Sequence, residues 1–330
     1  MQIVDDSCCT QVDIAFIVVT FNSEKFIWQC INSINSNFID SGLSSSIIIV
    51  DNASSDNTRN ILFDIEESIK NTQIILLNKN VGFGSANNIG FNAISAQYYV
   101  LINSDAWLIA DSITPAVKAM RSNSSIAVCG LPLVFPNGEP QTYVYRFSSW
   151  QRWVLAILRV RTLIAKLLLT KAGKNLLSRL SFGREFVLSQ SRPHITLDQA
   201  SLLNYSGEVR QVDWVCGAGM VIAGDFIRNF HGFDPAIFLY GEDEDLCITA
   251  HRSGRKVVAA DVPPVVHMFG WGVSMFNRHV ADLKYTSLRY FIGKNIHRTP
   301  DRLLMLFLLP FYVYGIKRWY FAWRVGEDVS

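Results

Sequence analysis

The residues Tyr98-Tyr99-Val100-Leu101-Ile102-Asn103-Ser104-Asp105 give the clearest indication of the fold and of where the chemistry lies. Its first five residues form a compact apolar run of the kind that fills a buried β-strand. Asn103 and Asp105 follow at once, so two oxygen-bearing side chains are predicted at the carboxyl edge of a sheet. In open α/β sheets, ligands bind at that edge, and hard oxygen ligands suit Mg²⁺ or Mn²⁺. A plain turn after a strand is the simpler interpretation of Asn-Ser-Asp alone.

Outward from this strand, apolar runs alternate with helix-like stretches through the N-terminal half of the chain. Strands are predicted over residues 14–20, 47–50, 74–77, 98–102 and 126–131. Helices are predicted over about 24–36, from 55 or 56 to about 70, from the turn at 80–88 to about 95, and over 113–120. Ser23 is expected to cap the first helix with its hydroxyl. The alternation predicts an α/β fold with a Rossmann-like, mostly parallel central sheet, right-handed crossovers and flanking helices.

An acidic run, Glu242-Asp243-Glu244-Asp245, follows the aromatic-rich Phe238-Leu239-Tyr240. Adjacent carboxylates repel, and each raises the free energy needed to ionise the next. A charge run of this kind is often a solvated helix face. The aromatic lead-in instead indicates that at least one carboxylate points into a pocket, where a general base would be built.

Composition limits the classes of function. A chain of 330 residues can form one large domain or two small ones. The formal net charge is +2, so no nucleic-acid partner is expected. The six cysteines include no CxxC pair, which argues against a zinc site or a disulfide framework and favours a reducing compartment. Residues 1–10 are polar and acidic, so no signal peptide is expected there.

Two dinucleotide- and phosphate-binding motifs do not fit the sequence. Gly82-Phe83-Gly84 precedes a helix, but Asn87 stands where GxGxxG requires its third glycine, and GxxxxGK[ST] is absent. A nicotinamide-binding domain places its glycine turn after the first strand, where Thr20-Phe21-Asn22-Ser23 has none. A flexible turn remains the simpler interpretation of the two glycines.

Several short motifs occur in a fixed order along the chain. They are residues 18–22, 49–56, 80–90, 101–105, 214–220, 232–234, 238–246 and 267–270. Each is weak alone, but the ordered set resembles the family 2 inverting glycosyltransferases, which have the GT-A fold. The chain most resembles the bacterial rhamnosyltransferase-like branch, over about residues 13–272.

The resemblance implies a role for each candidate residue. Contacts with the donor nucleotide are implied for Thr20, Asn22, Asp51, Gly82, Gly84, Asn87 and Asn103. Asp51 would accept a hydrogen bond from the base ring N–H. Asp105 would ligate Mg²⁺ or Mn²⁺ and His267 would be a further metal or diphosphate contact, while Asn103 replaces the first Asp of the family's DxD. Asp243 would be the general base with Glu242 and Asp245 supporting it, and Trp214, Gly217 and Ala218 would lie beside the acceptor or sugar.

These roles lead to a specific expectation of function. We expect an inverting glycosyltransferase that moves a sugar, with L-rhamnose from dTDP-L-rhamnose as the best guess, to a lipid-linked or polysaccharide acceptor. Such an enzyme would serve cell-surface glycan biosynthesis, for example that of lipopolysaccharide. Two alternatives stay open: a sugar nucleotidyltransferase, which would want a glycine-rich basic loop after the first strand, and a non-catalytic membrane scaffold.

Two segments predict contact with a membrane surface. Residues 150–180 form a basic amphipathic insert, in which Trp150 to Arg179 contains no Asp or Glu. Residues 303–315 are apolar but fall short of the ~20 residues that a spanning helix needs, and basic and aromatic residues follow at 317–324. We therefore expect a GT-A domain over 1–272 and a C-terminal helical, membrane-interfacial segment over 273–330, peripheral at the cytoplasmic face of the inner membrane. Packing onto the core or a homodimer contact is the alternative.

Overall fold

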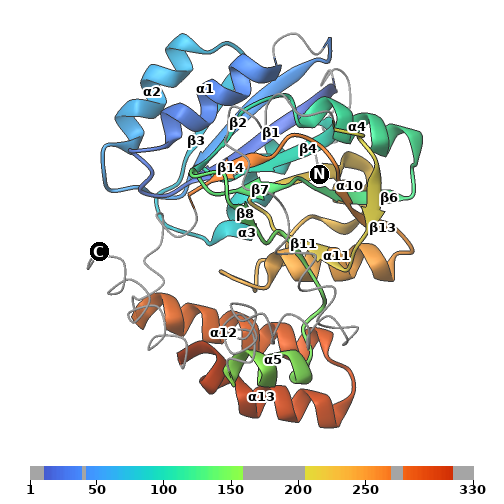
Figure 1. The fold of residues 1–330 in the computed structure, drawn as a ribbon. Helices are drawn as coiled ribbons and strands as arrows, with labels where there is room; N and C mark the ends of the chain where they lie inside the picture. The colour runs from blue at the N-terminus through green and yellow to red at the C-terminus, as the bar shows by residue number, and fades with distance from the viewer. Residues whose placement is uncertain (1–10, 39–41, 159–204, 269–277, 315–330) are drawn as a thin grey trace, which may run out of the picture. The chain divides into compact units, whose positions relative to one another are not determined.

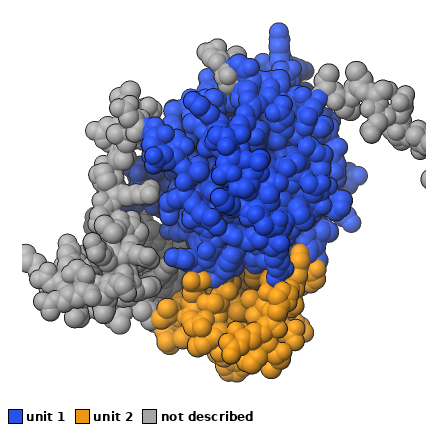
Figure 2. Space-filling view, turned by 90° about the vertical axis from the view of Figure 1, so that its right-hand side faces the viewer, with its two compact units in different colours: residues 1–147, 195–274 blue, residues 148–194, 275–330 orange. Residues whose placement is uncertain are grey.

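The computed structural model describes residues 11–38, 42–158, 205–268 and 278–314. The chain divides into two compact units, coloured separately in Figure 2. Unit 1 comprises Met1–Phe147 and Ile195–Ser274, and unit 2 comprises Ser148–His194 and Met275–Ser330. Each unit is built from two separate stretches of chain.

Unit 1 is an α/β body (Figure 1). Its strands are β1 (Val12–Thr20), β2 (Ser45–Asp51), β3 (Thr72–Leu76), β4 (Ala96–Ile102), β5 (Ala106–Leu108), β6 (Ile126–Gly130), β7 (Leu133–Val134), β8 (Pro140–Gln141), β9 (Val144–Tyr145), β10 (Val209–Gln211), β11 (Trp214–Val215), β12 (Gly219–Ala223), β13 (Lys256–Ala260) and β14 (Val265–His267). Its helices are α1 (Ile27–Phe38), α2 (Thr58–Ser68), α3 (Phe83–Ala93), α4 (Ile113–Ser122), α10 (Gly224–Phe230) and α11 (Glu242–Arg252).

The main sheet has eight strands in the order β10-β13-β6-β12-β4-β1-β2-β3. Strands β4, β1, β2 and β3 are parallel. Right-handed crossovers then place α1 and α2 on one side and α3 on the other, as Figure 1 shows. Strand β12 enters antiparallel between β4 and β6, and β10 is antiparallel to β13. The sheet is therefore mixed but mostly parallel, as predicted: six of its eight strands run in one direction, and β12 and β10 run in the other.

The core lies on both faces of the central strands. From Ile14 to Thr20 every residue of β1 is buried, as expected for a strand covered by helices on both sides. Helix α1 buries Ile27, Ile31 and Ile34, which recur at the spacing of one helix face. The apolar runs that predicted strands thus also form the core.

A second, four-stranded sheet has the order β5-β14-β7-β8. Strand β14 pairs antiparallel with β5, so that His267 lies opposite Ala106, the residue after Asp105. Strand β7 pairs parallel with β14 and antiparallel with β8. This small sheet therefore brings His267, from the last of the ordered motifs, next to the loop that follows β4.

Unit 2 contains three described helices, α5 (Trp150–Ile157), α12 (Arg278–Asn295) and α13 (Thr299–Tyr314). Trp153 stacks on Tyr312 with ring centroids 4.5 Å apart, and the Tyr314 hydroxyl donates a 2.8 Å hydrogen bond to Asp282. One face of α13 buries Met305, Leu309 and Val313. The side chains of Leu303, Phe307 and Phe311 are 60%, 66% and 54% exposed.

The segments predicted to touch a membrane are described in part. Only α5 and its neighbouring residues represent the basic insert at 150–180, and residues 159–180 and 315–324 lie outside the described part of the chain. The apolar run from 303 continues as a helix through Pro310 to Tyr314. Among the described helices, none combines the length and hydropathy that a membrane crossing requires.

Candidate active site

Three loops meet at the carboxyl edge of the parallel strands. Thr20 at the end of β1 lies beside Asp51 at the end of β2, and the Thr20 carbonyl accepts a hydrogen bond from the Asn52 N–H. The Ser23 and Ser104 hydroxyls lie 2.7 Å apart, which joins the loop after β1 to the Asn-Ser-Asp loop after β4. The prediction that the Ser23 hydroxyl caps the first helix is wrong, because α1 begins at Ile27, and the Phe26 and Ile27 N–H groups bond to the Ser23 carbonyl and not to its hydroxyl.

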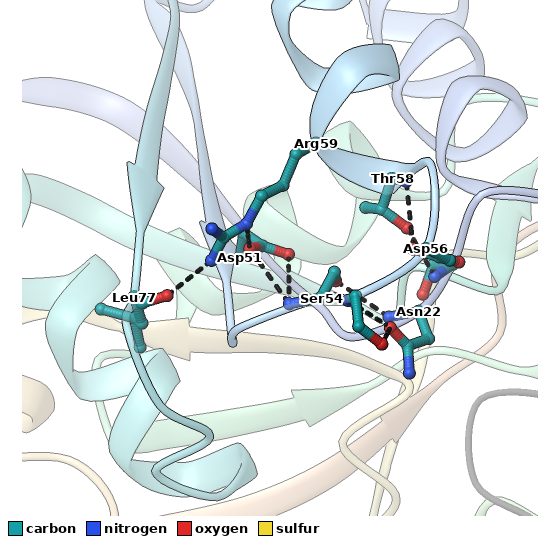
Figure 3. Close-up of polar contacts among 9 residues, drawn as sticks. Asn22, Asp51, Ser54, Asp56, Thr58, Arg59 and Leu77 are labelled. Carbon is teal, nitrogen blue, oxygen red and sulfur yellow. Dashed lines mark hydrogen bonds and ion pairs between the residues drawn. The ribbon is translucent and has the colours of Figure 1, made fainter.

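Asp51 is fully buried and its carboxylate is held from two directions (Figure 3). It accepts a 2.7 Å bond from Arg59 Nε and a 3.2 Å bond from the Ser54 N–H. Arg59 also donates from Nη2 to the Leu77 carbonyl at 2.6 Å. The guanidinium thus compensates a buried negative charge and fixes the carboxylate at the strand end, where the resemblance implies contact with a nucleobase.

Thr20 ends β1, and Asn22 lies in the loop that follows it. The Thr20 side-chain oxygen is buried and has no hydrogen-bond partner within the described residues. Asn22 adopts a left-handed backbone, with φ of 52°, and its Oδ1 accepts a 2.8 Å bond from the Ser55 N–H (Figure 3). Asn22 therefore shapes the loop after β2, and the contact with a nucleoside implied for it stays a prediction.

Gly82 and Gly84 are explained by close packing. Gly82 has a φ of 89°, and a Cβ there would lie 2.5 Å from the Phe238 carbonyl oxygen. A Cβ on Gly84 would lie 2.9 Å from the Phe233 Cβ. The glycines let the start of α3 pack directly on the segment that leads to the acidic run, a reason independent of any nucleotide.

Two asparagines on α3 make side-chain hydrogen bonds here, and Asn88 supports this contact. Asn87 is buried and donates from Nδ2 to the Phe83 carbonyl at 2.9 Å. Asn88 forms two hydrogen bonds with the Phe233 backbone, 2.7 Å to the carbonyl and 2.8 Å from the N–H. The sequence did not predict this role of Asn88, because a pairing across 145 residues has no local sequence signal.

Asp105 and His267 form the candidate cation site. Asp105 Oδ1 lies 3.4 Å from His267 Nε2, and both side chains are largely buried. Asn103 Nδ2 lies 3.4 Å from the same ring nitrogen, and Asn103 Oδ1 is buried without a partner in the described residues. Two ligands of one ion, each at about 2.1 Å, lie about 3.0–3.5 Å apart. The pair fits a divalent cation on this measure, although no cluster of three or more His, Cys, Asp or Glu occurs within the described ranges.

The acidic run opens helix α11. Tyr240 and Gly241 have positive φ values of 68° and 102°, and they turn the chain sharply into the helix. Glu242, Glu244 and Asp245 are buried, so the run is not a solvated helix face. The positive end of the helix dipole favours carboxylates in the first turn. This first turn therefore gathers carboxyl groups inside the molecule.

Asp243 has the properties of a general base. Its Oδ2 accepts a 2.9 Å hydrogen bond from the Gly217 N–H, while its Oδ1 is buried and has no partner within the described part of the chain. Burial raises the pKa of the Asp243 carboxyl to about 6, against the opposing effect of the Gly217 N–H. A base with a pKa near the working pH combines the ionised form with a useful proton affinity.

The segment 216–218 connects Asp243 to the candidate cation site. Gly217 binds Asp243, and the carbonyl of the next residue, Ala218, accepts a 3.3 Å bond from the Asn103 N–H. Burial raises the pKa of the Cys216 thiol to about 12, and the negative charges of Asp243, Glu242 and Asp105 add to the increase. The carboxylates of the two motifs therefore lie around one short segment, in a single site.

The three residues implied to lie beside the acceptor or sugar occupy two places, the segment 216–218 and strand β11. Gly217 and Ala218 belong to the segment that joins the two motifs. Trp214 lies on β11, where it stacks on Tyr145 with centroids 4.3 Å apart and donates from Nε1 to the Arg146 carbonyl. Contact of these three residues with an acceptor stays a prediction.

Comparison with known proteins identifies the class of the chain. Residues 15–183, just over half of the chain, match the model of glycosyl transferase family 2. The chain belongs to this family and is a glycosyltransferase. The sugar nucleotidyltransferase and non-catalytic scaffold alternatives are therefore set aside.

Two curated relatives align with part of the chain. EpsH of Bacillus subtilis (strain 168) is 23% identical over 122 residues, which cover 37% of this chain and 34% of EpsH. The succinoglycan biosynthesis protein ExoO of Rhizobium meliloti (strain 1021) is 27% identical over 128 residues, 38% of this chain and 35% of ExoO. The alignments thus span about a third of each relative.

Solved structures share the fold at low sequence identity. The mannosyltransferase PcManGT of Pyrobaculum calidifontis, in complex with GDP-Man and Mn²⁺, superposes with a TM-score of 0.54 and 12% identity over 93% of this chain and 74% of its own. GalNAc-T7, with UDP, GalNAc and Mn²⁺, gives a TM-score of 0.55 and 14% identity over 93% and 57%. The fold is therefore of the α/β GT-A type.

Proposed function

We propose that the chain catalyses an inverting sugar transfer with Asp243 as the general base. The observation that carries the proposal is the position of the Asp243 carboxylate. The carboxylate accepts a hydrogen bond from the Gly217 N–H, and the next residue, Ala218, accepts one from the Asn103 N–H of the Asn-Ser-Asp loop. A raised pKa of about 6 suits a carboxylate that must accept a proton near neutral pH.

In this reaction the acceptor hydroxyl oxygen attacks the anomeric carbon of the donor sugar. The bond between that carbon and the diphosphate oxygen breaks on the opposite face, and its electron pair leaves with the nucleoside diphosphate. The acceptor proton passes to the unpartnered Oδ1 of Asp243. One displacement inverts the anomeric centre and needs no covalent nucleophile on the protein.

Asp105 and His267 are proposed to hold a divalent cation at the diphosphate. A bound cation supplies charge neutralisation for the leaving group. Mg²⁺ and Mn²⁺ are bound in such sites by one or two protein ligands together with substrate phosphates, which suits a two-residue site. Two structures of the same fold contain Mn²⁺, which supports a cation at this position without choosing between the two metals.

The proposed donor is dTDP-L-rhamnose, on the resemblance of the ordered motifs to the rhamnosyltransferase-like branch. Asp51 offers a carboxylate for the ring N–H of a pyrimidine base, and Arg59 fixes its orientation. The proposed acceptor is a lipid-linked or polysaccharide glycan in cell-surface polysaccharide biosynthesis. The name of ExoO as a succinoglycan biosynthesis protein supports that context.

The decisive experiment is a donor panel. The protein is incubated with Mn²⁺, acceptor glycans and dTDP-, UDP- or GDP-linked sugars, and release of nucleoside diphosphate is measured. NMR of the product then reports the anomeric configuration. Transfer with inversion from dTDP-L-rhamnose is expected. Retention at the anomeric carbon contradicts the base mechanism, and a preference for another donor contradicts only the choice of donor.

We further propose that unit 2 rests on the cytoplasmic face of the inner membrane. The exposed apolar face of α13, formed by Leu303, Phe307 and Phe311, supports this proposal, together with the basic and aromatic sequence at 317–324. Flotation with anionic liposomes tests it. The wild-type chain should float and Phe307→Glu/Phe311→Glu should float less, with an exposed Phe63→Glu change on α2 as the control. Equal flotation of all three forms excludes α13 as the contact, and no flotation excludes the membrane.

A further inference from the structure

Gln141, on strand β8, is buried and spans β7 to reach His267 on β14. Its side-chain amide makes contacts at both ends. Nε2 donates to the Val134 carbonyl at 3.2 Å and to the carbonyl of His267 itself. Oε1 lies 3.0 Å from His267 Nδ1. No local pattern in the sequence marks this glutamine, because its partner is 126 residues away.

The two carbonyl groups determine the orientation of this amide. A carbonyl oxygen only accepts hydrogen bonds, so the NH₂ group of Gln141 must face the Val134 and His267 carbonyls. The reversed amide would set its oxygen against two other oxygens. Its carbonyl oxygen is therefore the atom that faces His267 Nδ1, and it can only accept. In this arrangement Nδ1 carries the proton.

The protonation of Nδ1 determines the state of the other ring nitrogen. In a neutral imidazole one nitrogen is a donor and the other has a free lone pair. The lone pair of His267 then lies on Nε2, the atom 3.4 Å from Asp105 Oδ1. A lone pair and a carboxylate oxygen that face each other are two ligands for one cation. The opposite tautomer would place an N–H where the cation should bind.

We infer that Gln141 is a positioning residue that holds His267 in the Nδ1–H tautomer and so presents Nε2 to the cation. This inference rests on the proposed cation site. Metal-bound histidines commonly donate their second N–H to an oxygen acceptor, and loss of that acceptor typically costs about 10–100-fold in metal affinity or activity. Gln141 supplies that acceptor from a neighbouring strand.

Three variants separate this role from a general structural one. Gln141→Met keeps a similar volume but removes the acceptor. Gln141→Glu keeps an oxygen that can face Nδ1 and should therefore keep the Nδ1–H tautomer, while its second oxygen, set against the Val134 and His267 carbonyls, should lower the stability of the fold. Asn37→Leu is the matched control, because Asn37 also donates to the small sheet, at the Leu108 carbonyl on β5, but has no contact with His267.

The first readout is the tautomer itself. Two-bond ¹H–¹⁵N spectra of ¹⁵N-histidine-labelled protein are recorded without metal at pH 8, with His267→Gln to assign the signals among the six histidines. Wild type, Gln141→Glu and Asn37→Leu should show His267 protonated at Nδ1. Gln141→Met should show a mixture of tautomers or the Nε2–H form. An Nε2–H ring in the wild type, or an unchanged ring in Gln141→Met, overturns the inference.

The second readout is Mn²⁺ binding, measured by EPR of the free ion with no other ligand present. Gln141→Met should raise the Mn²⁺ dissociation constant by about 10–100-fold, while Gln141→Glu and Asn37→Leu stay within about threefold. Wild-type affinity in Gln141→Met overturns the inference and leaves the proposed cation site standing. Affinity of wild type no greater than that of Asp105→Ala refutes the cation site, and the role of Gln141 in presenting a ligand fails with it.

Discussion

Replacement of Gly217 by alanine should disable the base without disturbing donor binding. A Cβ at this position would lie 2.7 Å from Asp243 Oδ1 and 3.2 Å from its Cγ. Ordinary contact begins at 3.4 Å, so the carboxylate must move by about 0.7 Å. The 2.9 Å hydrogen bond from the Gly217 N–H to Oδ2 would be stretched by the same movement.

The size of this displacement predicts how much kcat should fall. Misplacement of a reacting group by about 1 Å can cost about 100-fold. A shift of about 0.7 Å should therefore lower kcat by about 10–100-fold, or about 1.4–2.7 kcal/mol in the activation free energy. The KM for the donor should stay within about threefold of wild type, because the substitution disturbs the contact of Gly217 with Asp243, whereas Asp51 is held by Arg59 and Ser54.

The assay is steady-state release of nucleoside diphosphate by Gly217→Ala, by wild type and by a control. Gly293→Ala is the matched control, since a Cβ there meets nothing within 4 Å and the residue lies inside helix α12. It should be neutral in activity and slightly more stable, by up to about 1 kcal/mol. Full activity of folded Gly217→Ala would refute the claim that this glycine positions the base, and a loss seen only as a raised donor KM would assign Gly217 to substrate binding.

Three further outcomes follow from the site. The Asp243 carboxyl has a raised pKa of about 6 and must be ionised to accept a proton. The value of kcat/KM should therefore rise with pH to a plateau, with a midpoint near pH 6. A flat profile from about pH 5 to 8 would exclude this base. Asp105→Ala should weaken Mn²⁺-dependent nucleotide binding and turnover more than Asn103→Ala, as measured by calorimetry and initial rates, and full activity in excess chelator would exclude the metal role. Arg59→Met should lower the free energy of unfolding by about 1–3 kcal/mol in urea denaturation, because it leaves buried Asp51 without its cation. An unchanged midpoint would show that the ion pair is dispensable.

Much of the fold could be predicted because the central parallel strands are short apolar runs buried on both faces. The run from Ile14 to Thr20 is visible without any partner, and so are the runs that end at Val50 and Ile102. Strand β12 was not predicted, since its insertion depends on pairing with β4 across more than a hundred residues and with β6 across 90 to 94. Long-range antiparallel pairing has no signature within one local window.

The site shows the same division. The ordered motifs led to Asp105 and Asp243, whose chemistry is carried by the residue type itself. The supporting groups were missed, because Arg59, Gln141 and Asn88 act through contacts that only the folded chain creates. The glycines near α3 were predicted to lie along a nucleotide, whereas the structure gives them a packing reason as well.

The measurement that tests the central claim most directly is the turnover of Asp243→Asn. The amide has the shape of the carboxylate, and its oxygen can still accept from the Gly217 N–H, but it cannot take a proton from the acceptor. Turnover should fall by about 10²–10⁴-fold, while nucleotide affinity measured by calorimetry stays at the wild-type value. Turnover within a few-fold of wild type, with the protein folded and the donor bound, would contradict the assignment of Asp243 as the base and would transfer that role to Glu242 or Asp245.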